Sequence, residues 1–251
     1  MSNKRYTVMT YIMGSYEKVH EVKEKSPNAQ YLLITDREDL ESKTWKVICD
    51  STLYGSAANK TRDVKWHPWR YTDDNIVIML DGSISVNESL DEIVEAFVAG
   101  GYELGMMIHP ERNTARDEMN AWMDWRCLNP NDAERQLSVM ESSGYSINSY
   151  RGLYQCCLKI CRRTPAVMRW LETVAGLLTL CGNRGEYATP EQVLASFALN
   201  KWWSFLPVMW VSERLINSHY LTWYIHGTDN PLIHTEFIQP YAFNKPVDVW
   251  M

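Results

Sequence analysis

An acidic residue directly follows a continuous apolar run in this chain. Ile76–Leu80 reads Ile-Val-Ile-Met-Leu, and Asp81, Gly82 and Ser83 come next. An acid after a buried strand lies at the carboxyl edge of a sheet, where open α/β sheets bind ligands. Asp81 and Ser83 are oxygen ligands suited to Mg²⁺ or Mn²⁺, with a diphosphate and water completing the shell. Gly82 allows close backbone approach, although an ordinary Asp-Gly turn explains the same letters.

Two cations precede this segment in the chain. Arg62 and Lys65 are three residues apart, so a helix would present them on one face. Beside a metal and a diphosphate, they would bind phosphate oxygens. The alternative is a solvated basic turn.

Further polar residues come after a predicted strand at residues 104–109. His109 would lie at the sheet edge, and Arg112 and Glu118 follow it. An imidazole or a carboxylate there can orient an acceptor hydroxyl or act as its base. Local capping and surface charge are the alternative explanation.

The later part of the chain adds a possible base and a possible metal ligand. Glu191 and Gln192 begin a predicted helix, and the spacing from Thr189 to Gln192 fits a capping box. A neutral imidazole of His226 or His234 can complete a metal shell. A lone histidine is, however, more often structural.

The elements that must position these residues alternate along the chain. Apolar runs predict strands at 6–13, 30–35, 44–49, 76–80, 104–109 and 153–161. Period and capping predict helices over 90–99, 113–126 and 164–181 and from 189 onward, while 128–149 is irregular or helical. Continuous apolar strands suit a parallel sheet covered on both faces. We expect one α/β domain over 1–251, with 206–251 as a C-terminal extension.

Composition narrows the classes of function. The 251 residues are 45% hydrophobic and 22% charged, which is typical of a globular protein. A net charge of −6 argues against a broad nucleic-acid surface. The six cysteines lack paired zinc spacing and are expected to be reduced thiols of a cytoplasmic protein. No run approaches the ~20 apolar residues of a membrane span.

The order of these motifs resembles a family of GT-A-like glycosyltransferases that includes bacterial capsular-polysaccharide-type and plant mucilage or cell-wall proteins. The resemblance covers roughly residues 6 to 205. Its motifs are Tyr11–Tyr16 with a Gly-x-Tyr turn, Tyr31–Asp36, Trp45–Val47, Arg62–Lys65 with His67–Pro68, Leu80–Gly82, His109–Arg112 with Glu118, and Arg162–Arg163. One departure concerns a late Arg-Asp-Gln, where this chain has Pro190-Glu191-Gln192.

The resemblance implies a GT-A-like fold with a mixed, mainly parallel sheet and a hexosyl- or pentosyltransferase that depends on Mn²⁺ or Mg²⁺. The donor is a nucleotide-diphosphate sugar, with a UDP-sugar expected, and the acceptor is a saccharide or a hydroxylated base in phage DNA. A non-catalytic nucleotide- or glycan-binding module and a nucleotidyltransferase or hydrolase stay open. The implied metal ligands are Asp81, Ser83 and His226; the catalytic residues are Glu191, Glu118 and His109; the donor-binding residues are Thr10, Tyr11, Gly14, Tyr16, Asp36, Arg62, Lys65, Gly82, Arg112 and Gln192.

Overall fold

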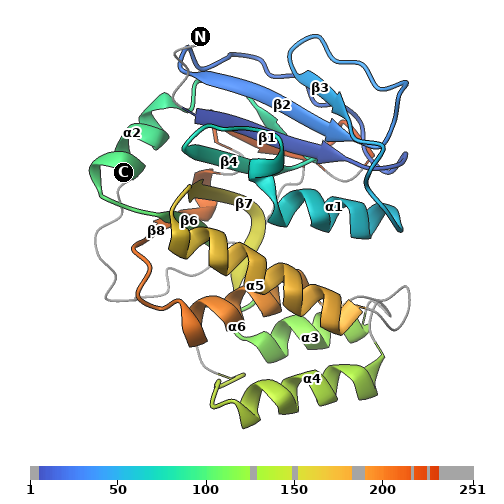
Figure 1. Ribbon diagram of the computed structural model, residues 1–251, viewed down its shortest axis with the longest axis vertical. Coiled ribbons are helices and arrows are strands. Elements are labelled where there is room, and N and C mark those ends of the chain that lie inside the picture. The colour runs from blue at the N-terminus through green and yellow to red at the C-terminus, as the bar shows by residue number, and fades with distance from the viewer. Residues whose placement is uncertain are drawn as a thin grey trace.

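The computed structural model describes residues 6–124, 129–148, 152–182, 190–215, 218–224 and 227–231. The strands of its central sheet are β1 (Tyr6–Ile12), β2 (Ala29–Thr35), β3 (Lys46–Cys49), β4 (Ile76–Asp81), β6 (Leu104–Ile108), β7 (Tyr154–Arg162) and β8 (Val208–Val211). They lie in the order β3-β2-β1-β4-β7-β6-β8 (Figure 1). Only the two pairings of β7 are antiparallel. The predicted mixed, mainly parallel sheet is therefore confirmed.

The apolar strands are continuous because both faces of the sheet are covered. Every residue of β1 is buried, and so is every residue of β4 before Asp81. On one face, Val8 and Leu80 pack in a core that includes Phe97 of α2 (Asp91–Ala99). On the other face, Met9 and Met79 pack with α1 (Ala57–Trp66). Alternate side chains thus enter two different cores.

Four further helices cover the half of the sheet that contains β6, β7 and β8. Figure 1 shows them together below the strands, with α5 and α6 next to each other. Trp170 of α5 meets Trp66 of α1 edge to face, with ring centroids 5.5 Å apart. These helices are α3 (Ala115–Asp124), α4 (Pro130–Ser142), α5 (Pro165–Gly182) and α6 (Glu191–Trp202).

The segment after residue 206 joins the main body of the fold. It supplies β8, an edge strand that runs parallel to β6. It also supplies β9 (Leu221–Trp223), which pairs with β5 (Ile84–Val86) in a small second sheet. No helix within the described ranges is long and apolar enough to cross a membrane. The five cysteines in those ranges are free thiols, as expected.

The connections of β1 and β4 leave the sheet in opposite directions. The chain passes from β1 to β2 on one side, whereas after β4 it continues toward β6 on the other side. In open α/β sheets, such a switch point opens a crevice beyond the carboxyl ends of the two strands. Tyr11 and Asp81 are register partners at those ends. The sequence candidate Asp81 therefore stands at the switch point.

Candidate active site

Asp81 is the centre of a cluster of charged side chains from three elements. The Tyr11 hydroxyl donates a hydrogen bond to Asp81 Oδ1, and Lys65 Nζ lies 2.9 Å from the same oxygen. Lys65 also forms an ion pair with Glu191 Oε1. Trp66 Nε1 lies 3.4 Å from the other oxygen of Glu191. A single lysine thus joins two carboxylates that are far apart in the sequence.

Local structure explains how these groups meet. Helix α1 begins at Ser56, whose side chain accepts a hydrogen bond from the backbone of Asn59, and it carries Lys65 in its last turn. Glu191 is the first residue of α6, where the partial positive charge of a helix N-terminus favours a carboxylate. Gly82 allows close packing beneath the cluster, because a Cβ there would lie 2.8 Å from the Tyr11 carbonyl oxygen.

Each charge in the cluster stabilises its partner. Burial alone would lower the pKa of Lys65, but Asp81 and Glu191 raise it well above its usual value. Burial would raise the pKa of Asp81, but the charge of Lys65 and the hydrogen bond from Tyr11 lower it. The side chain of Lys65 is only 4% exposed, against 27% for Asp81 and 19% for Glu191. A ligand therefore reaches the carboxylates more easily than the ammonium.

Arg62 lies one turn before Lys65 on α1, as its spacing predicted. Its guanidinium is half-buried, and it forms neither a hydrogen bond nor an ion pair with any residue that the structure describes. Burial lowers its pKa, and the charge of Glu191 raises it in part. A guanidinium has five donors and stays charged. Arg62 is thus a cation with free donors beside the cluster.

The turn after β1 brings two further predicted residues to this edge. Asp36 Oδ1 accepts a hydrogen bond from the backbone of Gly14 at 2.8 Å, and its Oδ2 pairs with Lys60 of α1 at 2.8 Å. Gly14 has a φ of 65°, which favours glycine. Burial and the nearby charge of Asp81 raise the pKa of Tyr16 to about 12. Thr10, by contrast, is buried inside the sheet.

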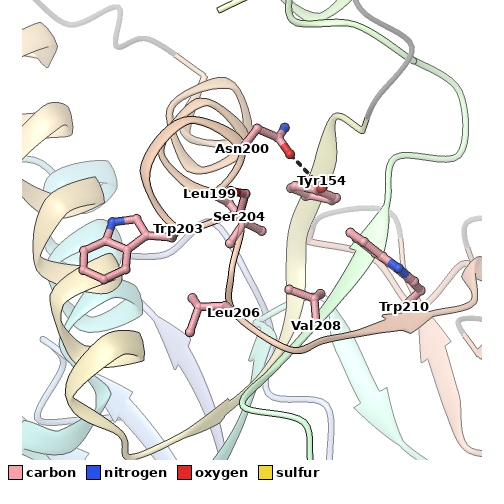
Figure 2. A pocket seen from close by; sticks show the side chains of 8 residues that line it. All are labelled: Tyr154, Leu199, Asn200, Trp203, Ser204, Leu206, Val208 and Trp210. Carbon is pink, nitrogen blue, oxygen red and sulfur yellow. Dashed lines mark hydrogen bonds between the residues drawn. The ribbon is translucent and has the colours of Figure 1, made fainter.

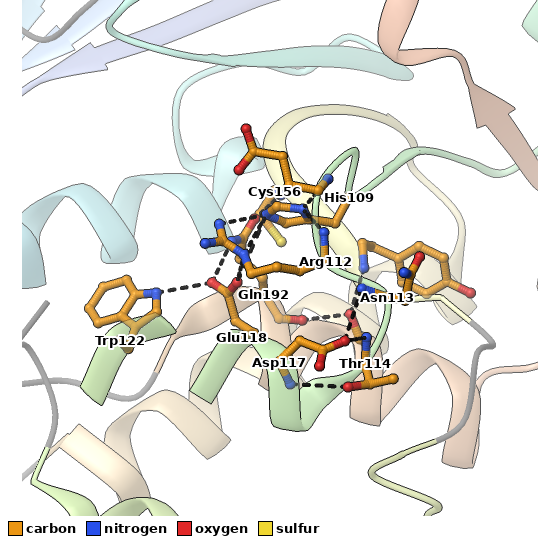
Figure 3. A network of polar contacts seen from close by, with 12 residues as sticks. His109, Arg112, Asn113, Thr114, Asp117, Glu118, Trp122, Cys156 and Gln192 are labelled. Atoms are coloured by element: carbon orange, nitrogen blue, oxygen red, sulfur yellow. Dashed lines mark hydrogen bonds and ion pairs between the residues drawn. The ribbon is translucent and has the colours of Figure 1, made fainter. Parts of the chain in front are cut away.

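The other candidates form a separate buried network (Figure 3). Glu118 is fully buried, and Arg112 Nε lies 2.5 Å from its Oε2. Trp122 Nε1 and Gln192 Nε2 donate to the other oxygen at 2.9 and 2.7 Å. His109, which is 3% exposed, lies with its Nε2 2.8 Å from Arg112 Nη2. This network surrounds the start of α6 and is suited to positioning rather than to contact with substrate.

The capping-box interpretation of Gln192 is wrong. Helix α6 has Pro190 at its N-cap, without a side-chain hydrogen bond, and Thr189 lies outside the described residues. The Gln192 amide instead donates to Glu118 and accepts from the backbone N–H of Cys156 on β7 at 3.3 Å. A buried carboxylate and an unpaired strand N–H are better partners for the amide than a solvated helix end.

The described residues do not fit a divalent-metal site. Ser83 is fully buried, and its hydroxyl accepts a hydrogen bond from Trp223 Nε1 at 3.1 Å. His226 and His234 lie outside the described residues. No group of three or more histidine, cysteine, aspartate or glutamate side chains in the described ranges could hold a metal ion. Asp81 is the remaining predicted ligand, and its Oδ1 already has a cation, Lys65.

The sequence analysis missed Lys159, which lies beneath the cluster. Its side chain is fully buried in β7, with Nζ 3.8 Å from the centroid of the Trp66 ring and 3.4 Å from the Lys65 carbonyl oxygen. Burial and the charge of Lys65 lower its pKa. The available signal was a lysine between Leu158 and Ile160 in an otherwise apolar strand.

A pocket of about 270 Å³ opens between the end of α6 and β8. Figure 2 shows Tyr154, Trp203 and Trp210 among its lining residues. Tyr154 stacks on Trp210, with centroids 5.2 Å apart, and its hydroxyl donates to Asn200 Oδ1 at 3.1 Å. Asn200 is nine residues beyond Glu191 on the same helix, or about 14 Å along its axis.

Comparison with known proteins gives one structural similarity of low degree. The chain is similar to mouse xyloside xylosyltransferase 1 in its apo form, with a TM-score of 0.46 and 10% identity over 82% of this chain and 84% of that chain. No protein-family model and no curated protein matches the sequence. The similarity assigns neither an activity nor a substrate, so the chemistry of the site must carry the functional argument.

Proposed function

We propose that the protein is a glycosyltransferase that moves a sugar from a nucleotide-diphosphate donor to a hydroxyl acceptor. A UDP-sugar is the first candidate donor. One observation carries the proposal: the accessible carboxylates of Asp81 and Glu191 share a buried lysine, beside the free guanidinium of Arg62, at the switch point of the sheet. Such a site offers a cation for phosphate and acceptors for sugar hydroxyls.

The donor would lie across the carboxyl ends of β1 and β4. Its diphosphate would contact Arg62, its sugar hydroxyls would donate to Asp81, and its nucleoside would lie toward the turn that contains Gly14 and Asp36. During transfer, the bond between sugar C1 and the phosphate oxygen breaks, and the electron pair stays on that oxygen. The acceptor oxygen bonds to C1, and its proton passes to a carboxylate.

Glu191 is the best candidate for that carboxylate. Of the three residues that the sequence suggested as catalytic, Glu118 and His109 are buried in the network around Gln192. The side chain of Glu191 is 19% exposed and belongs to the cluster around Asp81. Exposure to a bound acceptor is the first requirement for a general base.

A saccharide is the acceptor that we favour over a hydroxylated DNA base. The pocket between α6 and β8 combines aromatic rings with the Asn200 amide, and sugar rings present both apolar faces and hydroxyl groups. A DNA acceptor needs a basic surface, whereas the chain has a net charge of −6. The pocket would hold an acceptor residue at a distance from the site of transfer.

The proposal is tested by incubating the protein with a panel of nucleotide-sugars and with either oligosaccharides or hydroxymethylated DNA, followed by mass detection of transfer. We expect transfer to oligosaccharide, and a loss of roughly 100-fold or more in the rate for Glu191→Gln. Glu95→Gln, at an exposed position on α2, is the matched control and should keep the wild-type rate.

Other results would point to the competing functions. Release of free sugar or pyrophosphate without an acceptor would indicate a hydrolase or a nucleotidyltransferase. A thermal shift with glycans and none with nucleotides would indicate a binding module. Full activity in Glu191→Gln would remove Glu191 from the reaction.

A further inference from the structure

We propose that this site binds the donor diphosphate without a divalent metal, because Lys65 already neutralises Asp81 and Arg62 is free to hold the phosphates. The inference rests on the proposed function and concerns how the same site recognises a nucleoside diphosphate. It departs from the metal dependence that the sequence led us to expect.

Lys65 occupies the position on Asp81 that a metal would need. Its ammonium lies 2.9 Å from Oδ1 and is held from the other side by Glu191. A divalent ion on the same carboxylate would face a like charge at close range. The carboxylate is also hydrogen-bonded by the Tyr11 hydroxyl, which a metal at Oδ1 would disturb.

Lys65 has little freedom to move aside. Its side chain is 4% exposed, and its Cα belongs to the last turn of α1, next to the buried Trp66. Lys159 lies beneath that turn, with its ammonium on the Trp66 ring and 3.4 Å from the Lys65 carbonyl oxygen. A metal would therefore have to displace a buried ammonium that already has two carboxylate partners.

Arg62 supplies the positive charge that the donor needs. It lies one helical turn from Lys65, close enough for the charge of Glu191 to act on its pKa, and it has no partner among the described residues. The remaining charges of the cluster balance: Lys65 and Arg62 are positive, and Asp81 and Glu191 are negative. A neutral cluster with one unengaged guanidinium is suited to an incoming diphosphate. Asp81 and Glu191 then serve as acceptors for hydroxyl groups.

Equilibrium binding of UDP and of GDP, measured by calorimetry with EDTA or with Mn²⁺, tests the inference. We expect each nucleotide that binds to do so within about twofold of the same affinity in both conditions. Arg62→Gln should weaken binding in EDTA by roughly 10- to 100-fold, since it removes charged hydrogen bonds. Arg70→Gln, an exposed arginine just beyond α1, makes the same change of charge and should bind within twofold of wild type.

The outcomes separate the two proposals. Binding that appears only with Mn²⁺, or an Arg62→Gln affinity equal to wild type, would overturn the inference and leave the glycosyltransferase proposal standing. Absence of binding by either nucleotide, and of transfer from any nucleotide-sugar, would overturn both. Circular dichroism and the thermal midpoint of Arg62→Gln must match wild type, and transfer by wild type in EDTA is the second readout that we expect to persist.

Discussion

Replacing Lys65 with methionine tests the central cluster through stability rather than activity. The change keeps a long side chain but removes the ammonium that Asp81 and Glu191 share. Both carboxylates then lose their counter-ion while still bound into the fold. Asp81 also keeps its hydrogen bond from the Tyr11 hydroxyl, so the variant isolates the missing charge.

The magnitude follows from burial. Removal of one partner from a fully buried ion pair costs about 3–5 kcal/mol of unfolding free energy. Here the ammonium is 4% exposed, but the carboxylates are 27% and 19% exposed and can regain some hydration. We therefore expect a loss of about 3 kcal/mol at pH 7, or a fall of roughly 6–12 °C in the melting temperature of a chain of this size.

The loss should also depend on pH. Lys65 holds the pKa of Asp81 below its usual value, so in wild type this stabilisation is complete above pH 5 and is lost as the pH falls below 3.8. The variant lacks it at every pH. The difference between the two unfolding free energies should therefore shrink from pH 7 toward pH 3.

Urea unfolding followed by circular dichroism measures both effects. Lys18→Met is the matched control, because Lys18 pairs with Asp229 at 2.8 Å but both side chains are exposed, and it should leave stability unchanged. A Lys65→Met variant within about 1 kcal/mol of wild type, or a difference that grows as the pH falls, would refute the reasoning.

Two further substitutions test how the site is held. Gly82→Ala should lose about 1–3 kcal/mol in urea unfolding, because its Cβ would meet the Tyr11 carbonyl oxygen at 2.8 Å; Gly176→Ala, in open space on α5, should instead gain about 0.5–1 kcal/mol, and equal effects would contradict the packing argument. Gln192→Ala should cost about 1–3 kcal/mol and lower kcat more than KM, since Glu118 and the Cys156 N–H each lose a partner; unchanged kcat would show that the network does not position α6.

The sheet could be predicted because its signals are local. β1, β2 and β4 are apolar runs of strand length, and an acid after the last of them, Asp81, marks the sheet edge. The pairing of Arg62 with Lys65 on one helix face also follows from spacing alone, and α1 confirms it. Such features depend on periodicity over a few residues, which the sequence displays directly.

The partners within the site depend on contacts that sequence spacing does not contain. Lys65 and Glu191 are 126 residues apart, and only the packing of α1 against the start of α6 brings them together. Gln192 fits a capping box by its local spacing, but burial gave it Glu118 and a strand N–H as partners instead. β8 and β9 were missed because short strands in an aromatic, turn-rich segment have weak periodicity.

A crystal structure of the protein with a bound nucleotide-sugar tests the central claim most directly. We predict the donor beyond the carboxyl ends of β1 and β4, with its diphosphate within hydrogen-bonding distance of the Arg62 guanidinium and its sugar against Asp81. A donor bound at any other place, such as the pocket between α6 and β8, would contradict the account.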